Sequence, residues 1–107
     1  MAKKILIVDD EPDLFKIISF RLIKMGYEIL DIVSTGQDAL DLLKEKTPDL
    51  IILDLLMPRL NGYEVCRQIK SNSRLSHIPV IIFTACNKYD VLQKADEAGA
   101  DDCLFKI

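Results

Sequence analysis

The 107-residue sequence has no apolar stretch long enough to cross a membrane, which takes about 20 residues as a helix. Residues 5–8 are aliphatic and follow two lysines, but they stop at an acidic segment and are too short for a signal peptide. We therefore expect a cytoplasmic protein that makes no contact with a membrane.

Basic residues are not in excess either. The chain has 14 Lys and Arg against 17 Asp and Glu, which gives a formal net charge of −3. The two signs are interleaved, so no basic stripe is available for the phosphates of a nucleic acid. We expect no direct nucleic-acid contact from this segment.

Cysteine and histidine are sparse. The three cysteines, Cys66, Cys86 and Cys103, are far apart and form no C-x-x-C pair, which excludes a disulfide framework and a zinc site of the usual spacing. The single histidine, His77, precedes a predicted strand and should lie at the opposite end of the sheet from the strand ends considered below. We do not expect it to act as a ligand or phosphodonor.

Two aliphatic runs, residues 5–8 and 50–53, each end in acid. Continuous runs of this kind are typical of central strands buried on both faces of a parallel sheet. Asp9 and Asp10 follow the first run, and Asp54 follows the second. Asp54 either lies in the crevice at the end of its strand and takes part in chemistry, or caps the next turn.

The rest of the chain alternates between strand and helix patterns. Thr35 with Asp38 predicts a helix start, Gly26 predicts a helix end, and proline after Thr47 predicts the end of the second helix. Such alternation indicates an α/β fold with a parallel sheet. We predict a flavodoxin-like, doubly wound, five-stranded sheet of order 2-1-3-4-5. The strands are expected at residues 5–8, 27–33, 50–53, 79–84 and 103–106, and the helices near residues 14–25, 36–46, 62–70 and 91–98.

In this order the strand ends meet at one rim of the sheet, where ligands of doubly wound folds bind. The side chains expected there are Asp9, Asp10, Asp54, Thr84 and Lys106. Three neighbouring carboxylates repel one another unless a cation offsets them, and hard oxygen ligands suit Mg²⁺. An acidic pocket with a metal, a lysine and a hydroxyl suits a phosphoryl group, with Asp54 as the attacking oxygen.

Four segments of the chain carry a resemblance to a known family. They are ILIVDDE at residues 5–11, PDLIILDLLMP at 48–58 with Asn61-Gly62, FTA at 83–85, and AGADD at 98–102 leading to Lys106. Through them, and over essentially its whole length, the sequence resembles the receiver domains of bacterial two-component response regulators. The resemblance implies that Asp54 accepts a phosphoryl group from the phosphohistidine of a histidine kinase or phosphotransfer protein, or from a small acyl phosphate. It also implies a switch read by a downstream effector domain or protein, rather than an enzyme.

The same resemblance implies roles for individual residues. Asp10, Asp54 and the backbone carbonyl of Leu56 would ligate Mg²⁺ directly, and Asp9 would help through water. Thr84 and Lys106 would contact the phosphoryl oxygens.

Two positions depart from the family pattern. Cys103 stands where the family usually has an aromatic residue that turns inward on activation, and Ile107 stands where proline and a fifth helix usually follow. We therefore expect residues 1–107 to be a C-terminally truncated receiver domain that lacks the last helix. Apolar surface left uncovered on the last strand would favour self-association.

Two other functions stay open at this stage. A metal-dependent phosphohydrolase with an aspartyl nucleophile would need a second acid at the position of Leu56, which argues against it. A receiver-like interaction module that is not phosphorylated is the alternative that Cys103 and Ile107 support. A flavin site is disfavoured because the acidic first turn would repel the cofactor phosphate.

Overall fold

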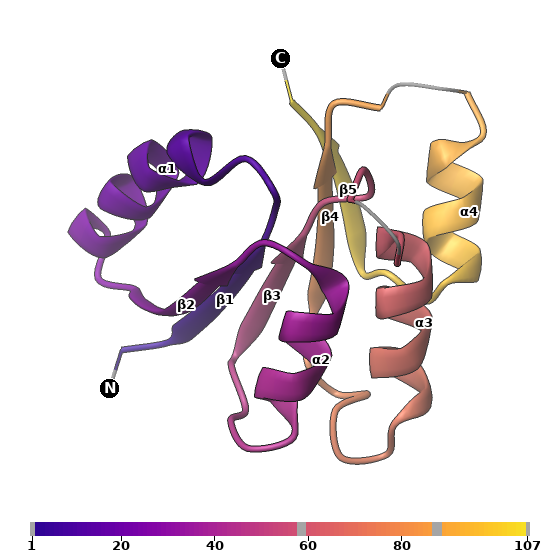
Figure 1. Ribbon diagram of the computed structural model, residues 1–107, viewed down its shortest axis with the longest axis horizontal. Coiled ribbons are helices and arrows are strands. Elements are labelled where there is room, and N and C mark those ends of the chain that lie inside the picture. The colour runs from indigo at the N-terminus through magenta and orange to yellow at the C-terminus, as the bar shows by residue number, and fades with distance from the viewer. Residues whose placement is uncertain (1, 58–59, 87–88, 107) are drawn as a thin grey trace.

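The computed structural model describes residues 2–57, 60–86 and 89–106. Within them, strands and helices alternate along the chain (Figure 1). The strands are β1 (Lys4–Val8), β2 (Glu28–Val33), β3 (Leu50–Leu53), β4 (Val80–Thr84) and β5 (Asp102–Phe105). The helices are α1 (Pro12–Lys24), α2 (Gly36–Leu43), α3 (Gly62–Ser71) and α4 (Val91–Glu97).

The strands form one sheet in the order β2-β1-β3-β4-β5, and every neighbouring pair is parallel. This confirms the predicted α/β fold and its strand order. The polar β2 lies at one edge and the short β5 at the other, while β1 and β3 are central. The carboxyl ends of β1 and β3, which diverge to opposite sides through α1 and α3, therefore share the switch point of the sheet.

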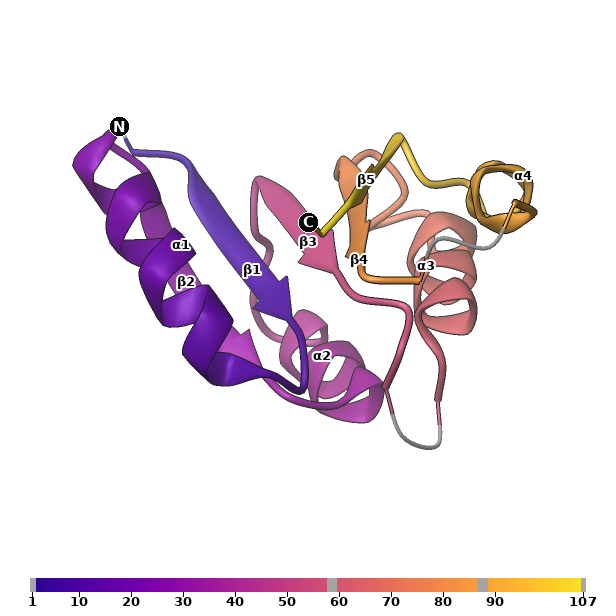
Figure 2. The ribbon, with the colours of Figure 1, turned by 90° about the horizontal axis from the view of Figure 1, so that it is seen from above.

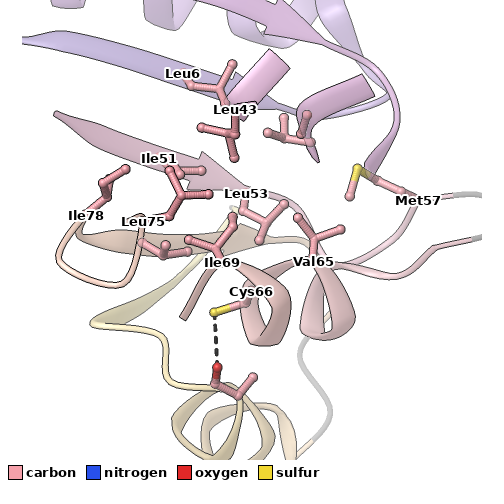
Figure 3. Packing of buried hydrophobic residues seen from close by; sticks show 14 residues of the cluster. Leu6, Leu43, Ile51, Leu53, Met57, Val65, Cys66, Ile69, Leu75 and Ile78 are labelled. Atoms are coloured by element: carbon pink, nitrogen blue, oxygen red, sulfur yellow. Dashed lines mark hydrogen bonds between the residues drawn. The ribbon is translucent and has the colours of Figure 1, made fainter. Parts of the chain in front are cut away.

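Alternation along the central strands separates two apolar layers. Ile5 and Ile7 pack with Phe15 of α1 on one face. Leu6 and Val8 belong to the larger core on the other face, beneath α2 and α3 (Figure 3). Figure 2 shows α1 separated from the other three helices by the sheet. The side chains at the centre of the larger core, all fully buried, are Leu6, Leu43, Ile51, Leu53, Val65 and Ile69.

The face covered by α1 is less completely buried than the continuous aliphatic run of β3 predicted. Ile51 and Leu53 are inaccessible to solvent, but Leu50 and Ile52 on the opposite face are only partly buried. Ile52 lines an apolar hollow of about 190 Å³ at this face. The prediction of burial on both faces was therefore wrong for one face, because α1 packs mainly over β1 and β2 and leaves the middle of the sheet partly open.

Helix ends follow local signals with one exception. Gly26, with φ +97°, follows α1, and Thr35 caps α2 by accepting a hydrogen bond from the Asp38 N–H at 3.0 Å. Both had been predicted. However, α2 ends at Leu43, whereas the helix was predicted to run to about residue 46, just before the Thr47-Pro48 pair. A distant residue explains the difference, because the Arg74 guanidinium donates to the Leu43 carbonyl oxygen and satisfies the helix end there.

The edge strand β5 exposes apolar side chains. Leu104 is 48% exposed and Phe105 is 39% exposed, in agreement with the apolar surface predicted for the last strand. Self-association through this surface stays a prediction. Among the described residues, no helix has both the length and the apolar character needed to cross a bilayer.

Candidate functional site

The three predicted acidic residues come together at the carboxyl ends of β1 and β3. The Asp54 N–H donates to the Val8 carbonyl oxygen at 2.9 Å, which continues the β1–β3 pairing beyond the last strand residue. Carboxylate oxygens of Asp9, Asp10 and Asp54 lie within 4.8 Å of one another. Asp9 and Asp54 are buried and Asp10 is exposed. The parallel register therefore places three carboxylates in one small volume.

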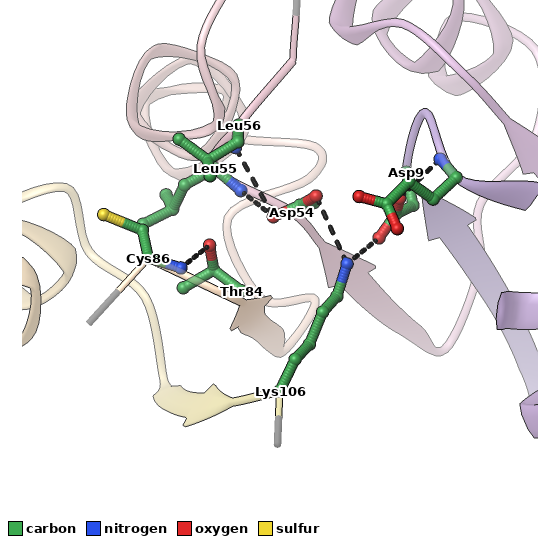
Figure 4. Close-up of polar contacts among 8 residues, drawn as sticks. Asp9, Asp54, Leu55, Leu56, Thr84, Cys86 and Lys106 are labelled. Atoms are coloured by element: carbon green, nitrogen blue, oxygen red, sulfur yellow. Dashed lines mark hydrogen bonds and ion pairs between the residues drawn. The ribbon is translucent and has the colours of Figure 1, made fainter.

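Lys106, which follows the edge strand β5, reaches this cluster with its side chain (Figure 4). Its Nζ lies 2.6 Å from Oδ2 of Asp9 and 3.3 Å from Oδ2 of Asp54. The Lys106 backbone N–H donates to the Thr84 carbonyl oxygen at 2.8 Å, which fixes the start of the side chain beside β4. The predicted lysine is thus present in the pocket, and it bridges the two buried carboxylates.

Burial and charge oppose each other at this pair. Burial raises the pKa of Asp9 above the ordinary aspartate value, and hydrogen bonds from Lys106 and the Glu11 N–H offset only part of that rise. Burial lowers the pKa of Lys106, but the hydrogen bond to Asp9 and the charges of Asp54 and Asp9 outweigh it, so that pKa is raised. The ammonium is therefore held firmly in its charged form by the acids.

Asp54 caps the next turn and also faces the pocket, while its part in chemistry stays a prediction. One oxygen, Oδ1, accepts hydrogen bonds from the N–H groups of Leu55 at 2.8 Å and Leu56 at 3.4 Å, as a cap of the following turn would. The other oxygen, Oδ2, faces Lys106. The turn thus fixes the carboxylate and leaves one of its oxygens directed into the pocket.

The start of α3 supports this turn. Asn61 caps the helix by accepting a hydrogen bond from the Glu64 N–H at 3.0 Å. A Cβ at Gly62 would collide with the Asp54 carbonyl oxygen and would lie 2.8 Å from the Leu55 Cα. Only glycine lets α3 approach the backbone of Asp54 so closely.

Thr84 ends β4 and is fully buried. Its Oγ1 accepts a hydrogen bond from the Cys86 N–H at 3.1 Å, which links the strand end to the loop that follows (Figure 4). The last β4 residue that pairs with β3 is Ile82, opposite Leu53, and Thr84 lies two residues further along the strand, at the same carboxyl rim as Asp54. Its predicted contact with a phosphoryl group stays a prediction.

The remaining predicted residues fall as follows. The Leu56 side chain is 56% exposed, and a metal contact by its carbonyl stays a prediction. His77 is exposed and precedes β4, at the end of the sheet away from the pocket. Cys103 packs beside the small core of Leu55, Ile82, Val91 and Ala95. The predicted Ile107 departure and residues 58–59 lie outside the described residues.

The donor set fits a divalent cation. Three clustered carboxylates carry three negative charges, and the Lys106 ammonium offsets one of them. Carboxylate oxygens are the ligands that hard divalent ions prefer, and the exposed Asp10 gives the cluster a side open to water. The site is therefore chemically suited to hold one such ion.

Two aromatic residues at the site were not predicted from the sequence. The Lys106 Nζ lies 5.5 Å from the ring centre of Phe15 and 5.8 Å from that of Phe83. A signal existed for Phe83, because strand alternation directs it to the face opposite Thr84. Phe15 could not have been found without knowing how α1 crosses the sheet.

Fold and site together define a doubly wound α/β domain with an acidic pocket, suited to a divalent metal, at its switch point. A family model described as "Response regulator receiver domain" matches residues 5–107. The chain therefore belongs to the response regulator receiver domain family. As such it is a phosphoacceptor switch rather than a conventional enzyme.

Known proteins resemble it over almost its full length. The probable transcriptional regulator ycf27 of Guillardia theta is 42% identical over 106 residues, covering 97% of this chain and 39% of that protein. The phosphorylated cyanobacterial phytochrome response regulator RcpA superposes with a TM-score of 0.92 at 28% identity, covering 100% of this chain and 82% of that one. The Mn²⁺-bound form of the response regulator Rcp1 gives a TM-score of 0.87 at 29% identity, covering 98% and 81%.

The chain spans about two-fifths of the length of the curated relatives it matches. The likeness to these relatives therefore concerns their receiver part alone.

Proposed function

We propose that this domain is a two-component response regulator receiver in which Asp54 accepts a phosphoryl group from the phosphohistidine of a histidine kinase or phosphotransfer protein. The observation that carries the proposal is the pairing of a turn-anchored Asp54 carboxylate with the Lys106 ammonium, 3.3 Å from Oδ2. The domain accepts the group and changes state, and does not turn over a substrate.

In the transfer, a bond forms between an Asp54 carboxylate oxygen and phosphorus, while the bond from phosphorus to the donor nitrogen breaks and its electron pair leaves with the imidazole. The Leu55 and Leu56 N–H groups hold the carboxylate in place throughout. Lys106 and Thr84 then contact the phosphoryl oxygens. Positioning and charge neutralisation, rather than acid–base chemistry, lower the barrier.

Mg²⁺ is the cation that we propose for the acidic cluster, held by Asp10, Asp54 and the Leu56 carbonyl, with Asp9 acting through water. Bound there, it would neutralise negative charge on the phosphoryl oxygens. The family relative solved with Mn²⁺ supports a divalent ion at this kind of site. Lys106, which here pairs with both Asp9 and Asp54, would then be available to contact the phosphoryl group.

The output follows from the added charge. Phosphorylation adds negative charge and acceptor oxygens beside Thr84, whose hydroxyl is joined to the loop after β4 through the Cys86 N–H. We propose that the surface of α4 and β5 then changes its affinity for an effector domain or protein. The naming of one relative as a probable transcriptional regulator supports an effector of that kind. We propose that the domain acts in the cytoplasm.

A receiver-like interaction module that is never phosphorylated is the second candidate. Cys103 favours it, because a small thiol stands where an aromatic residue usually responds to phosphorylation. The buried Lys106–Asp9 pair at 2.6 Å would in that case be a permanent structural link.

Intact mass after incubation with acetyl phosphate and Mg²⁺ separates the two candidates. We expect the wild-type chain to gain one phosphoryl group, and Asp54→Asn and a chelator-treated sample to gain none. Asp49→Asn is the matched control, since it removes an acid at the opposite end of β3. A folded wild-type sample that stays unmodified by acetyl phosphate and by histidine-kinase donors would contradict the proposal and favour the interaction module.

A further inference from the structure

Lys106 is held by aromatic rings as well as by acids. Its Nζ lies over the rings of Phe15 and Phe83, at 5.5 and 5.8 Å from their centres. The two rings meet edge to face, with centres 6.0 Å apart and planes at 81°. Phe15 is inaccessible to solvent and the Lys106 side chain is only 10% exposed, so little water surrounds the ammonium.

This arrangement has a physical consequence. A buried ammonium loses hydration, and the negative face of a phenyl ring returns part of that free energy, more so where water is excluded. The carboxylates attract Lys106 from the pocket side, and the rings contact it from the α1 face of the sheet. The rings therefore limit the positions that the long, flexible lysine chain can take.

We propose that Phe15 and Phe83 are positioning residues that form an aromatic seat for Lys106, so that its ammonium stays at the phosphoryl pocket when the acids are taken up by a cation. The inference rests on the proposed phosphoryl transfer to Asp54. A lysine without such a seat would leave the pocket once Asp9 and Asp54 bind a metal, because its side chain could extend into solvent.

The exposed face of α1 offers a control for the cation–π contacts of Lys106. Lys24 lies over Phe20 at the same distance of 5.5 Å, but Phe20 is 64% exposed and makes none of the contacts of the acidic cluster. Phe20→Leu thus removes a cation–π pair of equal distance that is not part of the site. Ile69→Val, in the core beneath α3 on the other face of the sheet, reports the effect of lost core packing alone.

The test compares wild type with Phe15→Leu, Phe83→Leu, Phe83→Tyr and the two controls. The first readout is the rate of phosphorylation by acetyl phosphate with Mg²⁺. The second is the NMR shift of the Lys106 methylene protons next to the ammonium, with and without Mg²⁺ and without phosphodonor. Unfolding midpoints in urea establish the folded fraction of each sample.

The seat predicts that both leucine variants are phosphorylated on the order of threefold to tenfold more slowly, as expected for loss of one desolvated cation–π contact. Their Lys106 methylene protons lose part of the upfield ring-current shift that wild type keeps in Mg²⁺, because one of the two rings is removed in each. Phe83→Tyr, which retains the ring, recovers both the rate and the shift, and Phe20→Leu changes neither.

Unchanged Lys106 shifts in both leucine variants would overturn the seat. So would slowing that is no greater than in Ile69→Val at equal folded fraction. A wild-type chain that acetyl phosphate does not modify would count against the proposed function, and the Lys106 shifts in Mg²⁺ would then still decide for or against the seat.

Discussion

Replacing Lys106 by methionine should lower the free energy of unfolding, and both added Mg²⁺ and a lower pH should reduce this loss. Methionine keeps most of the length and apolar surface of lysine but removes the ammonium that lies 2.6 Å from Asp9 and 3.3 Å from Asp54. Asp9 is inaccessible to solvent and the Asp54 side chain is 4% exposed. The substitution therefore leaves two buried carboxylates facing each other without their shared partner.

The magnitude follows from the burial of the pair. Removing one member of a buried ion pair costs about 3–5 kcal/mol, because the remaining charge is left desolvated. Here we take the lower end, because both carboxylates keep hydrogen bonds from backbone N–H groups, Asp9 from Glu11 and Asp54 from Leu55 and Leu56. We expect a loss of about 3 kcal/mol in the free energy of unfolding at pH 7, or roughly 15 °C in the unfolding midpoint.

Urea unfolding at several pH values, with and without Mg²⁺, measures this effect. Because Asp9 has its pKa raised in the folded state, its protonation favours folding, so the deficit of Lys106→Met should shrink as the pH falls and widen as the pH rises. An ion at ten times its Kd stabilises the native state by about 1.4 kcal/mol. The variant should gain more than wild type does at equal Mg²⁺, because no ammonium competes for its carboxylates.

Lys44→Met is the matched control, since Lys44 pairs with Asp41 at the same 3.3 Å on the surface. It should leave the unfolding midpoint and its Mg²⁺ dependence unchanged. A Lys106→Met variant as stable as wild type in chelator at pH 7 would refute the reasoning. A deficit that Mg²⁺ does not reduce would refute the assignment of the acids to a metal site.

Three further predictions concern other parts of the chain. Burial raises the pKa of Asp101, but hydrogen bonds from Lys70 and the Val80 N–H outweigh burial, so that pKa is lowered. The Asp101 carboxylate therefore adds stability at pH values above its ordinary pKa, and this stability is lost as the pH falls through the folded pKa. Asp101→Asn should remove that part of the acid dependence in urea titrations from neutral pH to about pH 2. Asn61→Ala and Thr35→Ala should each lower the free energy of unfolding by about 1 kcal/mol, because each removes a helix cap. Only Asn61→Ala should also slow phosphorylation; equal phosphorylation rates in the two variants would show that the Asn61 cap does not support the Asp54 turn. Burial raises the pKa of Cys66 to about 11, so mass spectrometry should find two alkylated thiols in the native chain and three after denaturation; rapid native labelling of Cys66 would contradict its burial.

The fold could be predicted because its signals are local. The aliphatic runs that became β1 and β3 end in acid, and Gly26 and Thr35 mark helix ends by their own backbone and side-chain chemistry. The end of α2 could not be predicted. It depends on Arg74, which reaches the Leu43 carbonyl from 31 residues away.

The site also has features that could be predicted from the sequence and others that could not. Parallel strands bring their carboxyl ends to one rim, so the meeting of Asp9, Asp10 and Asp54 followed from the strand order. The partners of each side chain did not follow, because they depend on packing. The sequence gives no sign that α1 places Phe15 beneath Lys106, since this contact joins residues 91 positions apart.

The Thr84–Cys86 hydrogen bond has a mechanical consequence. A hydroxyl has one hydrogen to donate and lone pairs to accept, and in this structure the Thr84 oxygen accepts from the Cys86 N–H at 3.1 Å. Its hydrogen remains available for a phosphoryl oxygen. The Thr84 hydroxyl could therefore donate a hydrogen bond to a phosphoryl oxygen while it accepts one from the Cys86 N–H. If Asp54 is phosphorylated as proposed, movement of the Thr84 hydroxyl toward it would carry the Cys86 backbone along, because their hydrogen bond does not have to break first.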